Sequence, residues 1–472
     1  MKRRMLFLFV LLTLLSGLMV TFTNVAHAET RVSHISSSCI NPSGTTTLQG
    51  TLGGANYTIQ VPSNWNGTLV LYSHGYVFAT SPLLNPAPDA GDPLTGAALL
   101  NQGYALAGSS YSQNGWALQQ AFNDQIALLN FFDATCGQPI STIAWGHSLG
   151  GIITAGLVQL YPDRFAGALP MCGVVAGSVG TWNQALDSAF AFNVLLAGNA
   201  LSIVHITNPA AAFSQAESVL ALAQTTPQGQ ARIALAAALT DIPGWFDPAS
   251  PEPASKDFIT QEQNQFLWES KVDFAFAFFA RAELEARAGG NPSWNTGVDY
   301  RKQLELSSDS REVVALYKQA GLDLNTDLKT LATATRITAD SGAVAYLSRY
   351  IIFNGDLNIP VLTMHTTGDG LVVNQDEQAY ASVVRSEGNN SLLREIFVHR
   401  AGHCTFTPAE TLTAFQTLIH RLDTGKWDGS TNTDLLNQEA AALGPTLNIA
   451  PPAFLNFEPT VFLRPFDIRN ES

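Results

Sequence analysis

The sequence predicts an α/β protein with a mostly parallel central sheet, flanking helices and a large helical segment inserted between the sixth and seventh strands. Three observations support this class. A β-type run at residues 142–145 leads through a glycine-rich turn into an apolar helical run at 152–160. An apolar run at 359–364 has the composition of a buried parallel strand. Between residues 173 and 358 the chain is alanine-rich and helical in character.

The glycine-rich turn carries the strongest chemical signal. It reads Gly146-His147-Ser148-Leu149-Gly150, a G-x-S-x-G pentapeptide between a strand and a helix. A serine on so sharp a turn is forced into a strained backbone conformation, and small neighbours let the chains approach closely. Gly146 and Gly150 provide that room. We therefore predict that Ser148 is a nucleophile, with the helix from about Leu149 aiming unpaired N–H groups at a developing oxyanion.

A nucleophilic serine needs a base, and the base needs an acid that orients it. Asp369 follows the buried strand at 359–364, and His403 lies in the loop after a second strand at 392–398, just before a helix start at 407–410. The carboxyl ends of parallel strands meet at one edge of a sheet. The chain order serine, acid, histidine therefore predicts Ser148, Asp369 and His403 as a catalytic triad.

Other residues compete for these roles. Asp369 can also be an ordinary turn aspartate beside a glycine. His399 is the alternative base, but it lies within the strand rather than in the loop beyond it. His365 precedes Asp369 in the order and suits a role in the core, and His147 at the variable position before the serine suits packing. His403 is therefore the preferred base.

The oxyanion hole is expected to combine two backbone N–H groups. One belongs to Leu149, directly after the nucleophile. The other belongs to Gly75 or Tyr76, because the strand at 68–72 runs into Ser73-His74-Gly75-Tyr76, where a glycine lets the main chain turn.

With His74-Gly75, the G-x-S-x-G turn, Asp369 and His403 in place, the chain resembles the α/β-hydrolases over about residues 45–172 and 355–425. The resemblance implies a Ser-His-Asp hydrolase that works through an acyl-enzyme and needs no cofactor. The pair His403-Cys404 is similar to that of the tannase and feruloyl esterase group. In that group a cysteine beside the catalytic histidine is bonded to one beside the serine, whereas here His147 precedes Ser148.

Four cysteines allow two disulfides in three possible pairings. Cys172 follows the strand at 168–171, and Cys404 lies beside the base at the same sheet edge, so we expect these two to pair. Cys39 and Cys136 then meet at the opposite edge. Four buried free thiols are the alternative. The chain has no His-Glu-x-x-His or Cys-x-x-Cys pattern, so no metal site is predicted.

Residues 1–28 have the pattern of a secretory signal. Lys2, Arg3 and Arg4 precede a leucine-rich run, and Ala26-His27-Ala28 resembles a cleavage site. Secretion without a stable membrane span is expected, and an uncleaved anchor formed by residues 5–20 is the alternative. Removal of three positive charges takes the net charge from −14 to −17, which argues against nucleic acid as a partner. Nothing in the sequence indicates an oligomeric state.

After the signal, the chain divides into a core (29–172 and 359–428), a helical cap or lid (173–358) and an extended C-terminal strap (429–472) rich in proline and phenylalanine. The cap is expected to lie over Ser148 and to shape its pocket. The phenylalanine-rich stretch at 273–279 belongs either to the cap's own core or to the wall of an apolar channel. Helices in the cap are expected at 190–200, 211–223, 231–238, 262–288 and 310–320.

These features favour a secreted serine hydrolase that cleaves a small-molecule carboxylic ester with a hydrophobic or aromatic group. An exopeptidase of the same fold is the first alternative, and it needs a cap carboxylate to hold a free amine. Glu262, Glu269 and Asp273 could serve, although such residues more often mark a solvated helix face. A non-catalytic binding module is a second alternative, which the intact triad disfavours.

Overall fold

The computed structural model describes residues 39–466. The predicted signal at 1–28 and the end of the predicted strap, residues 467–472, lie outside this range. Among the helices between residues 39 and 466, none combines the length and hydropathy needed to cross a membrane.

A single nine-stranded sheet runs through the described part of the chain in the order β1-β2-β4-β3-β5-β6-β7-β8-β9. Neighbouring strands from β4 to β8 pair in parallel, while β1, β2 and β9 pair antiparallel at the edges. The predicted α/β class with a mostly parallel sheet is confirmed. The strands are β1 (Thr46–Leu52), β2 (Ala55–Val61), β3 (Thr68–Ser73), β4 (Ala105–Ser109), β5 (Ser141–His147), β6 (Gly167–Met171), β7 (Val361–Gly368), β8 (Leu393–Ala401) and β9 (Phe454–Leu455).

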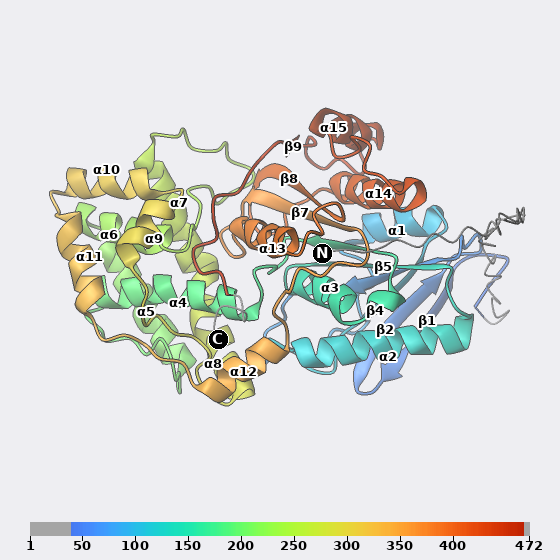
Figure 1. Ribbon diagram of the computed structural model, residues 1–472, viewed down its shortest axis with the longest axis horizontal. Helices are drawn as coiled ribbons and strands as arrows, with labels where there is room; N and C mark the ends of the chain where they lie inside the picture. Colours follow the sequence, from blue (N-terminus) through green and yellow to red (C-terminus); the bar gives the residue numbers. More distant parts are fainter. Residues whose placement is uncertain (1–38, 467–472) are drawn as a thin grey trace, which may run out of the picture. The chain divides into compact units, whose positions relative to one another are not determined.

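Helices cover both faces of the sheet, as its continuous apolar strands require. One hydrophobic core joins one face to α2 (Leu118–Cys136), α3 (Leu149–Leu160) and α13 (Gln375–Ser386). A second core joins the other face to α1 (Pro93–Asn101), α14 (Pro408–Thr424) and α15 (Thr433–Ala442). Figure 1 shows these two layers.

Residues 173–358, the helical insert, enter between β6 and β7 and have a hydrophobic core of their own. Figure 1 shows the insert as a group of green and yellow helices. The prediction matches α10 at both ends, but α4 begins twelve residues before the predicted 190–200 helix. The insert's α-helices are α4 (Ser178–Leu195), α5 (Pro209–Ala223), α6 (Pro227–Ala238), α7 (Phe258–Trp268), α8 (Arg281–Ala288), α9 (Tyr300–Leu306), α10 (Ser310–Ala320), α11 (Leu324–Thr333) and α12 (Ser341–Arg349).

The predicted helix at 262–288 is interrupted by two π-helical segments, η2 (Glu269–Asp273) and η3 (Phe276–Ala280), between α7 and α8. Helices α9, α11 and α12 had not been predicted. Each follows an aspartate at the N-cap position, Asp299, Asp323 and Asp340, which was the available signal in the sequence.

The C-terminal segment is not extended throughout, which corrects the prediction of a strap beginning at residue 429. Helix α15 forms first, because Asn432 caps it and Leu436 and Ala440 are buried against the sheet's second core. Beyond it the chain makes hydrogen-bonded turns up to Asn448 and then has no regular structure except β9 as far as residue 466. Strand β9 pairs with β8, and Arg464 then reaches the insert, where its Nη1 lies 2.6 Å from Asp187 Oδ2.

Candidate active site

Ser148 stands between β5 and α3 with φ 59° and ψ −124°, a left-handed conformation that costs a non-glycine residue energy. The predicted strand, sharp turn and helix are therefore present. A Cβ added to Gly146 would lie 2.5 Å from the Ser73 carbonyl oxygen, and one on Gly150 only 1.9 Å from the same oxygen. Both glycines are needed for β3 and the turn to approach each other.

Asp369 directly follows β7 and is fully buried. Its Oδ2 lies 2.7 Å from Nδ1 of His403, and its Oδ1 accepts hydrogen bonds from the N–H groups of Leu371 and Val372. Burial by itself would raise the pKa of Asp369, but the charge of His403 and hydrogen bonds from His365 and His403 lower it below its usual value. The structure thus brings together two of the three residues predicted as a triad, with the acid held ionised.

His365 lies beneath this pair and is fully buried. Its Nδ1 is 2.9 Å from Glu377 Oε1, and its Nε2 is 2.8 Å from the Val372 carbonyl oxygen and 3.6 Å from Asp369 Oδ2. Burial lowers its pKa, but hydrogen bonds to Asp369 and Glu377 outweigh burial and raise the pKa to about 10. Both ring nitrogens lie near acceptor oxygens, which favours the protonated ring. The ring packs against Asp369, consistent with the predicted core role.

The loop that carries His403 is fastened at both ends. On the strand side, Gly402 N–H donates to the Gly368 carbonyl oxygen, and the Thr366 hydroxyl donates to the Gly402 carbonyl oxygen. On the helix side, Thr407 and Glu410 form a capping box at the start of α14, as the helix start at 407–410 predicted. These contacts set the direction in which the His403 ring points.

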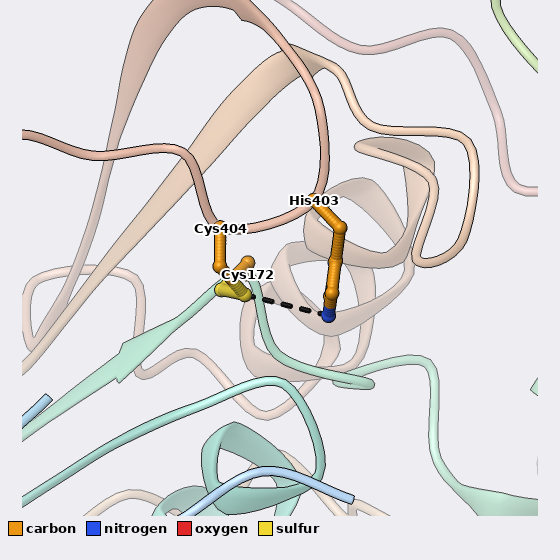
Figure 2. Close-up of side chains that lie close together, drawn as sticks. All are labelled: Cys172, His403 and Cys404. Atoms are coloured by element: carbon orange, nitrogen blue, oxygen red, sulfur yellow. Dashed lines mark hydrogen bonds between the residues drawn. A yellow bond between two sulfur atoms is a disulfide. The ribbon is translucent and has the colours of Figure 1, made fainter. Parts of the chain in front are cut away.

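The expected disulfides are both present, Cys172 with Cys404 and Cys39 with Cys136. The first ties the end of β6 to the His403 loop. His403 Nε2 lies 3.4 Å from Cys404 Sγ, and Figure 2 shows the histidine ring beside the disulfide. Cys172, His403 and Cys404 lie close enough together to suggest a metal site. Sulfur atoms bonded to each other are not thiolate ligands, so this cluster is better described as a disulfide packed against a histidine.

Ser148 is not hydrogen-bonded to His403 in this structure: within residues 39–466 its hydroxyl has no hydrogen-bond partner. The serine is half-buried and faces a pocket. Hydrogen bonds between a catalytic base and its nucleophile are often long without substrate and shorten when substrate binds.

The other histidines have different surroundings. His399 lies in β8, exposed, with Nε2 3.4 Å from Glu252. The His74 ring stacks on Tyr111 at a centroid distance of 4.1 Å, and the Tyr111 hydroxyl donates to the His74 carbonyl oxygen. For His147, burial and the charge of His403 lower the pKa to about 4 despite the opposing effect of Asp92. A neutral ring of this kind fits packing beside the base.

The three residues predicted for the oxyanion hole surround Ser148. A Cβ on Gly75 would lie 3.4 Å from Ser148 Cβ, and Leu149 and Tyr76 line the same pocket as the serine. Leu149 is the first residue of α3, so its N–H has no acceptor within the helix. In the described part of the chain, the N–H groups of Gly75 and Tyr76 also donate no hydrogen bond.

The pocket in front of Ser148 is strongly apolar and is walled mainly by the insert. Phe274 and Phe278 belong both to the insert's core and to the pocket wall, so the stretch at 273–279 serves both of its expected roles. Sequence reasoning did not find the other aromatic wall residues, which come from distant segments and share no motif. They are Trp116, Trp182, Phe192 and Phe462.

Glu262, Glu269 and Asp273 are not on a solvated helix face, which corrects the interpretation favoured from sequence. Glu262 and Glu269 are 0% and 1% exposed, and Glu269 and Asp273 line the pocket with Ser148. Glu262 lies in α7, and Glu269 and Asp273 are the first and last residues of the π-helical segment that follows.

The parallel sheet, the serine at the β5–α3 turn and the aspartate–histidine pair beyond β7 and β8 define an α/β-hydrolase. The chain belongs to the same family as the o-phthalyl amidase of Xanthobacter agilis, with which it is 30% identical over 423 residues, 82% of this chain and 89% of the amidase. No family model matches the chain.

Solved structures similar to this chain include two esterases and a peptidase. The cell wall degrading esterase LipA of Xanthomonas oryzae is 12% identical over 80% of this chain and 88% of its own, with a TM-score of 0.35. Feruloyl esterase B of Aspergillus oryzae is 13% identical over 81% and 80%, with a TM-score of 0.37. The acylaminoacyl peptidase of Pyrococcus horikoshii is 8% identical over 80% and 42%, with a TM-score of 0.37.

Proposed function

We propose that this protein is a serine hydrolase that cleaves a carboxylic ester or amide through an acyl-enzyme on Ser148. The observation that carries the proposal is the position of Ser148, strained at the β5–α3 turn, in the wall of an aromatic pocket. The Asp369–His403 pair ends at the same edge of the sheet. The amidase relative supports widening the proposal from esters to amides.

In the proposed mechanism, His403 Nε2 takes the proton of Ser148 Oγ as that oxygen attacks the substrate carbonyl. Asp369 holds Nδ1 of His403 protonated and stabilises the imidazolium that forms. The N–H groups of Leu149 and of Gly75 or Tyr76 stabilise the oxyanion. His403 returns the proton to the leaving group, and water, activated by the same base, releases the acid. No cofactor takes part.

The substrate is proposed to be a small molecule with an aromatic or otherwise bulky apolar acyl group. Aromatic rings from several segments line the pocket wall, and the insert provides most of that wall. Export from the cell is part of the proposal, supported by the two disulfides and by the signal pattern at residues 1–28.

The proposal is tested by labelling the protein with a fluorophosphonate probe and by measuring turnover of methyl esters and anilides of benzoic acid. Wild type should be labelled, and Ser148→Ala should lose labelling and about a thousandfold or more in kcat/KM. Ser188→Ala, a matched control from the pocket wall, should keep its labelling. A folded wild type that neither labels nor turns over any substrate would favour the binding module and overturn the proposal.

A further inference from the structure

Glu269 and Asp273 bring two carboxyl groups into a largely apolar pocket. The wall contains a third carboxyl group, Asp376, whose Oδ1 accepts hydrogen bonds from the Ala176 N–H and the Thr181 hydroxyl. They are the first and last residues of the π-helical segment η2, and both line the pocket that contains Ser148. Segments of π-helix within longer helices occur frequently at functional sites. The aromatic residues that follow, Phe274, Phe276 and Phe278, line the same pocket.

These carboxyl groups have no partner in the described part of the chain. Glu269 is 1% exposed, and neither of its oxygens is hydrogen-bonded. The Oδ2 of Asp273 is also inaccessible to solvent and unbonded. Among the described residues of the pocket wall there is no lysine, arginine or histidine. Buried carboxyl groups normally find donors within the protein, so an unsatisfied pair in a ligand pocket indicates that the ligand supplies the donors.

The missing donors identify the ligand chemistry. Burial raises the pKa of Glu269 well above its usual value, and the nearby Asp273 adds to this effect. A bound cation would lower the pKa of Glu269 again, because it would supply both a positive charge and several hydrogen-bond donors. Aromatic faces such as those of Phe274 and Phe276 also attract cations. A substrate carboxylate would add a further acidic group, and a phenol would supply a single donor and no charge.

We propose that Glu269 and Asp273 form a subsite for a protonated amino group on the substrate, so that the preferred substrates are esters or amides of amine-bearing aromatic acids. This inference rests on the proposed function, because it places the amine in the same pocket as the attacking serine. It gives the pocket two parts: aromatic walls for the ring and a carboxyl pair for the amine.

The test compares methyl esters that differ in charge: phenylalanine methyl ester, its deaminated analogue methyl 3-phenylpropanoate, and monomethyl phthalate as the carboxylate-bearing case. Wild type should favour the amine over the deaminated ester about tenfold or more in kcat/KM. That ratio should fall about tenfold in Glu269→Gln/Asp273→Asn, and by less in each single variant. Glu262→Gln is the matched control, because Glu262 is buried on the preceding helix but lies outside the pocket wall, and it should keep the wild-type ratio.

The inference would be overturned, and the proposed function left intact, if wild type hydrolysed methyl 3-phenylpropanoate or monomethyl phthalate with a kcat/KM equal to that for phenylalanine methyl ester. If no ester is hydrolysed, the proposed function fails, and calorimetry tests the subsite separately. The probes are 3-phenylpropylamine and 3-phenylpropan-1-ol, titrated into wild type and the double variant. Tighter binding of the amine that the double variant loses would support the subsite, and equal binding of amine and alcohol would overturn it. If the double variant does not fold, the Asp273→Asn comparison decides.

Discussion

A buried ion pair of the α/β core contrasts with two buried carboxyl groups of the helical insert that have no cation. In the core, Arg400 makes two hydrogen bonds to Glu410, at 2.6 and 3.0 Å, and Glu410 also accepts from the Thr407 N–H. In the insert, Glu262 and Glu312 are buried without a cation, each with one unsatisfied oxygen. Glu410 is thus paired within the fold, whereas Glu262 and Glu312 are not, although the insert also contains the paired Asp327.

This difference separates structural polar groups from candidate ligand-binding ones. Burying an uncompensated carboxyl group costs stability, so a protein retains several of them only where another requirement applies. The pair that lines the pocket, Glu269 and Asp273, is where that requirement can be identified. Four experiments with seven substitutions test the contrast, from the largest expected effect to the smallest.

Close backbone packing should make the turn between β5 and α3 the position least tolerant of an added side chain. Gly150→Ala places a Cβ 1.9 Å from the Ser73 carbonyl oxygen, and we expect a loss of about 4 kcal/mol or more in the free energy of unfolding, together with loss of activity. Gly342→Ala in α12 of the insert has open space around it and should stabilise by about 0.5–1 kcal/mol. Urea denaturation measures both, and a Gly150→Ala protein of wild-type stability would contradict the close approach.

Removal of one partner from a buried ion pair should affect the core more than the insert. Arg400→Met leaves Glu410 charged and fully buried, and we expect a loss of about 3 kcal/mol. Arg232→Met in the insert breaks a pair whose arginine is 29% exposed, and we expect about 1 kcal/mol. The two losses are compared in the same denaturant titration, and equal losses would mean that the two regions do not differ in this way.

Glu312 of the insert is a buried carboxyl group without a cation partner, and its removal should stabilise the protein at neutral and basic pH but not at acidic pH. Burial, with the nearby Asp309 and Glu262, raises the pKa of Glu312 to about 9. Its protonated form is therefore favoured by folding. Above its ordinary pKa of 4.5 the unfolded chain ionises, and the acid then opposes folding increasingly as pH rises toward about 9.

Glu312→Gln should accordingly raise the free energy of unfolding by about 2 kcal/mol at pH 8 and have little effect near pH 4.5. Paired unfolding curves of wild type and variant at the two pH values give this difference. A stabilisation that is the same at both would show that Glu312 stays neutral or ionised throughout.

The smallest effect is expected from the helix caps. Thr407→Ala removes the cap of α14 and should cost about 1 kcal/mol together with some activity, because the His403 loop leads directly into this helix. Asn208→Ala removes the cap of α5 in the insert and should cost a similar amount without changing activity. Activity measured at a temperature well below unfolding separates the two cases. Equal activity of the Thr407→Ala and Asn208→Ala variants would show that the position of the His403 loop does not depend on the α14 cap.

The sequence predicted much of this site because its signals are local. A strand, two glycines and a helix around Ser148 leave the chain few ways to turn, and Asp369 and His403 each follow an apolar strand in the order that the superfamily uses. The sheet's edge strand β9 and helix α15 were missed, since neither has periodicity strong enough to stand out within a proline-rich tail. Residue type and spacing were sufficient for the core and insufficient for the tail.

The sequence by itself determined the sharp turn at Ser148, the chain order of the candidate triad and the presence of a helical insert. Only the tertiary structure decided that Glu269 and Asp273 face the pocket, that His365 supports Asp369, and that Phe462 from the tail joins the wall. The physical reason is the distance along the chain between the residues that interact. Turn geometry and strand composition depend on neighbours along the chain, whereas burial and charge compensation depend on segments that meet only when the chain has folded.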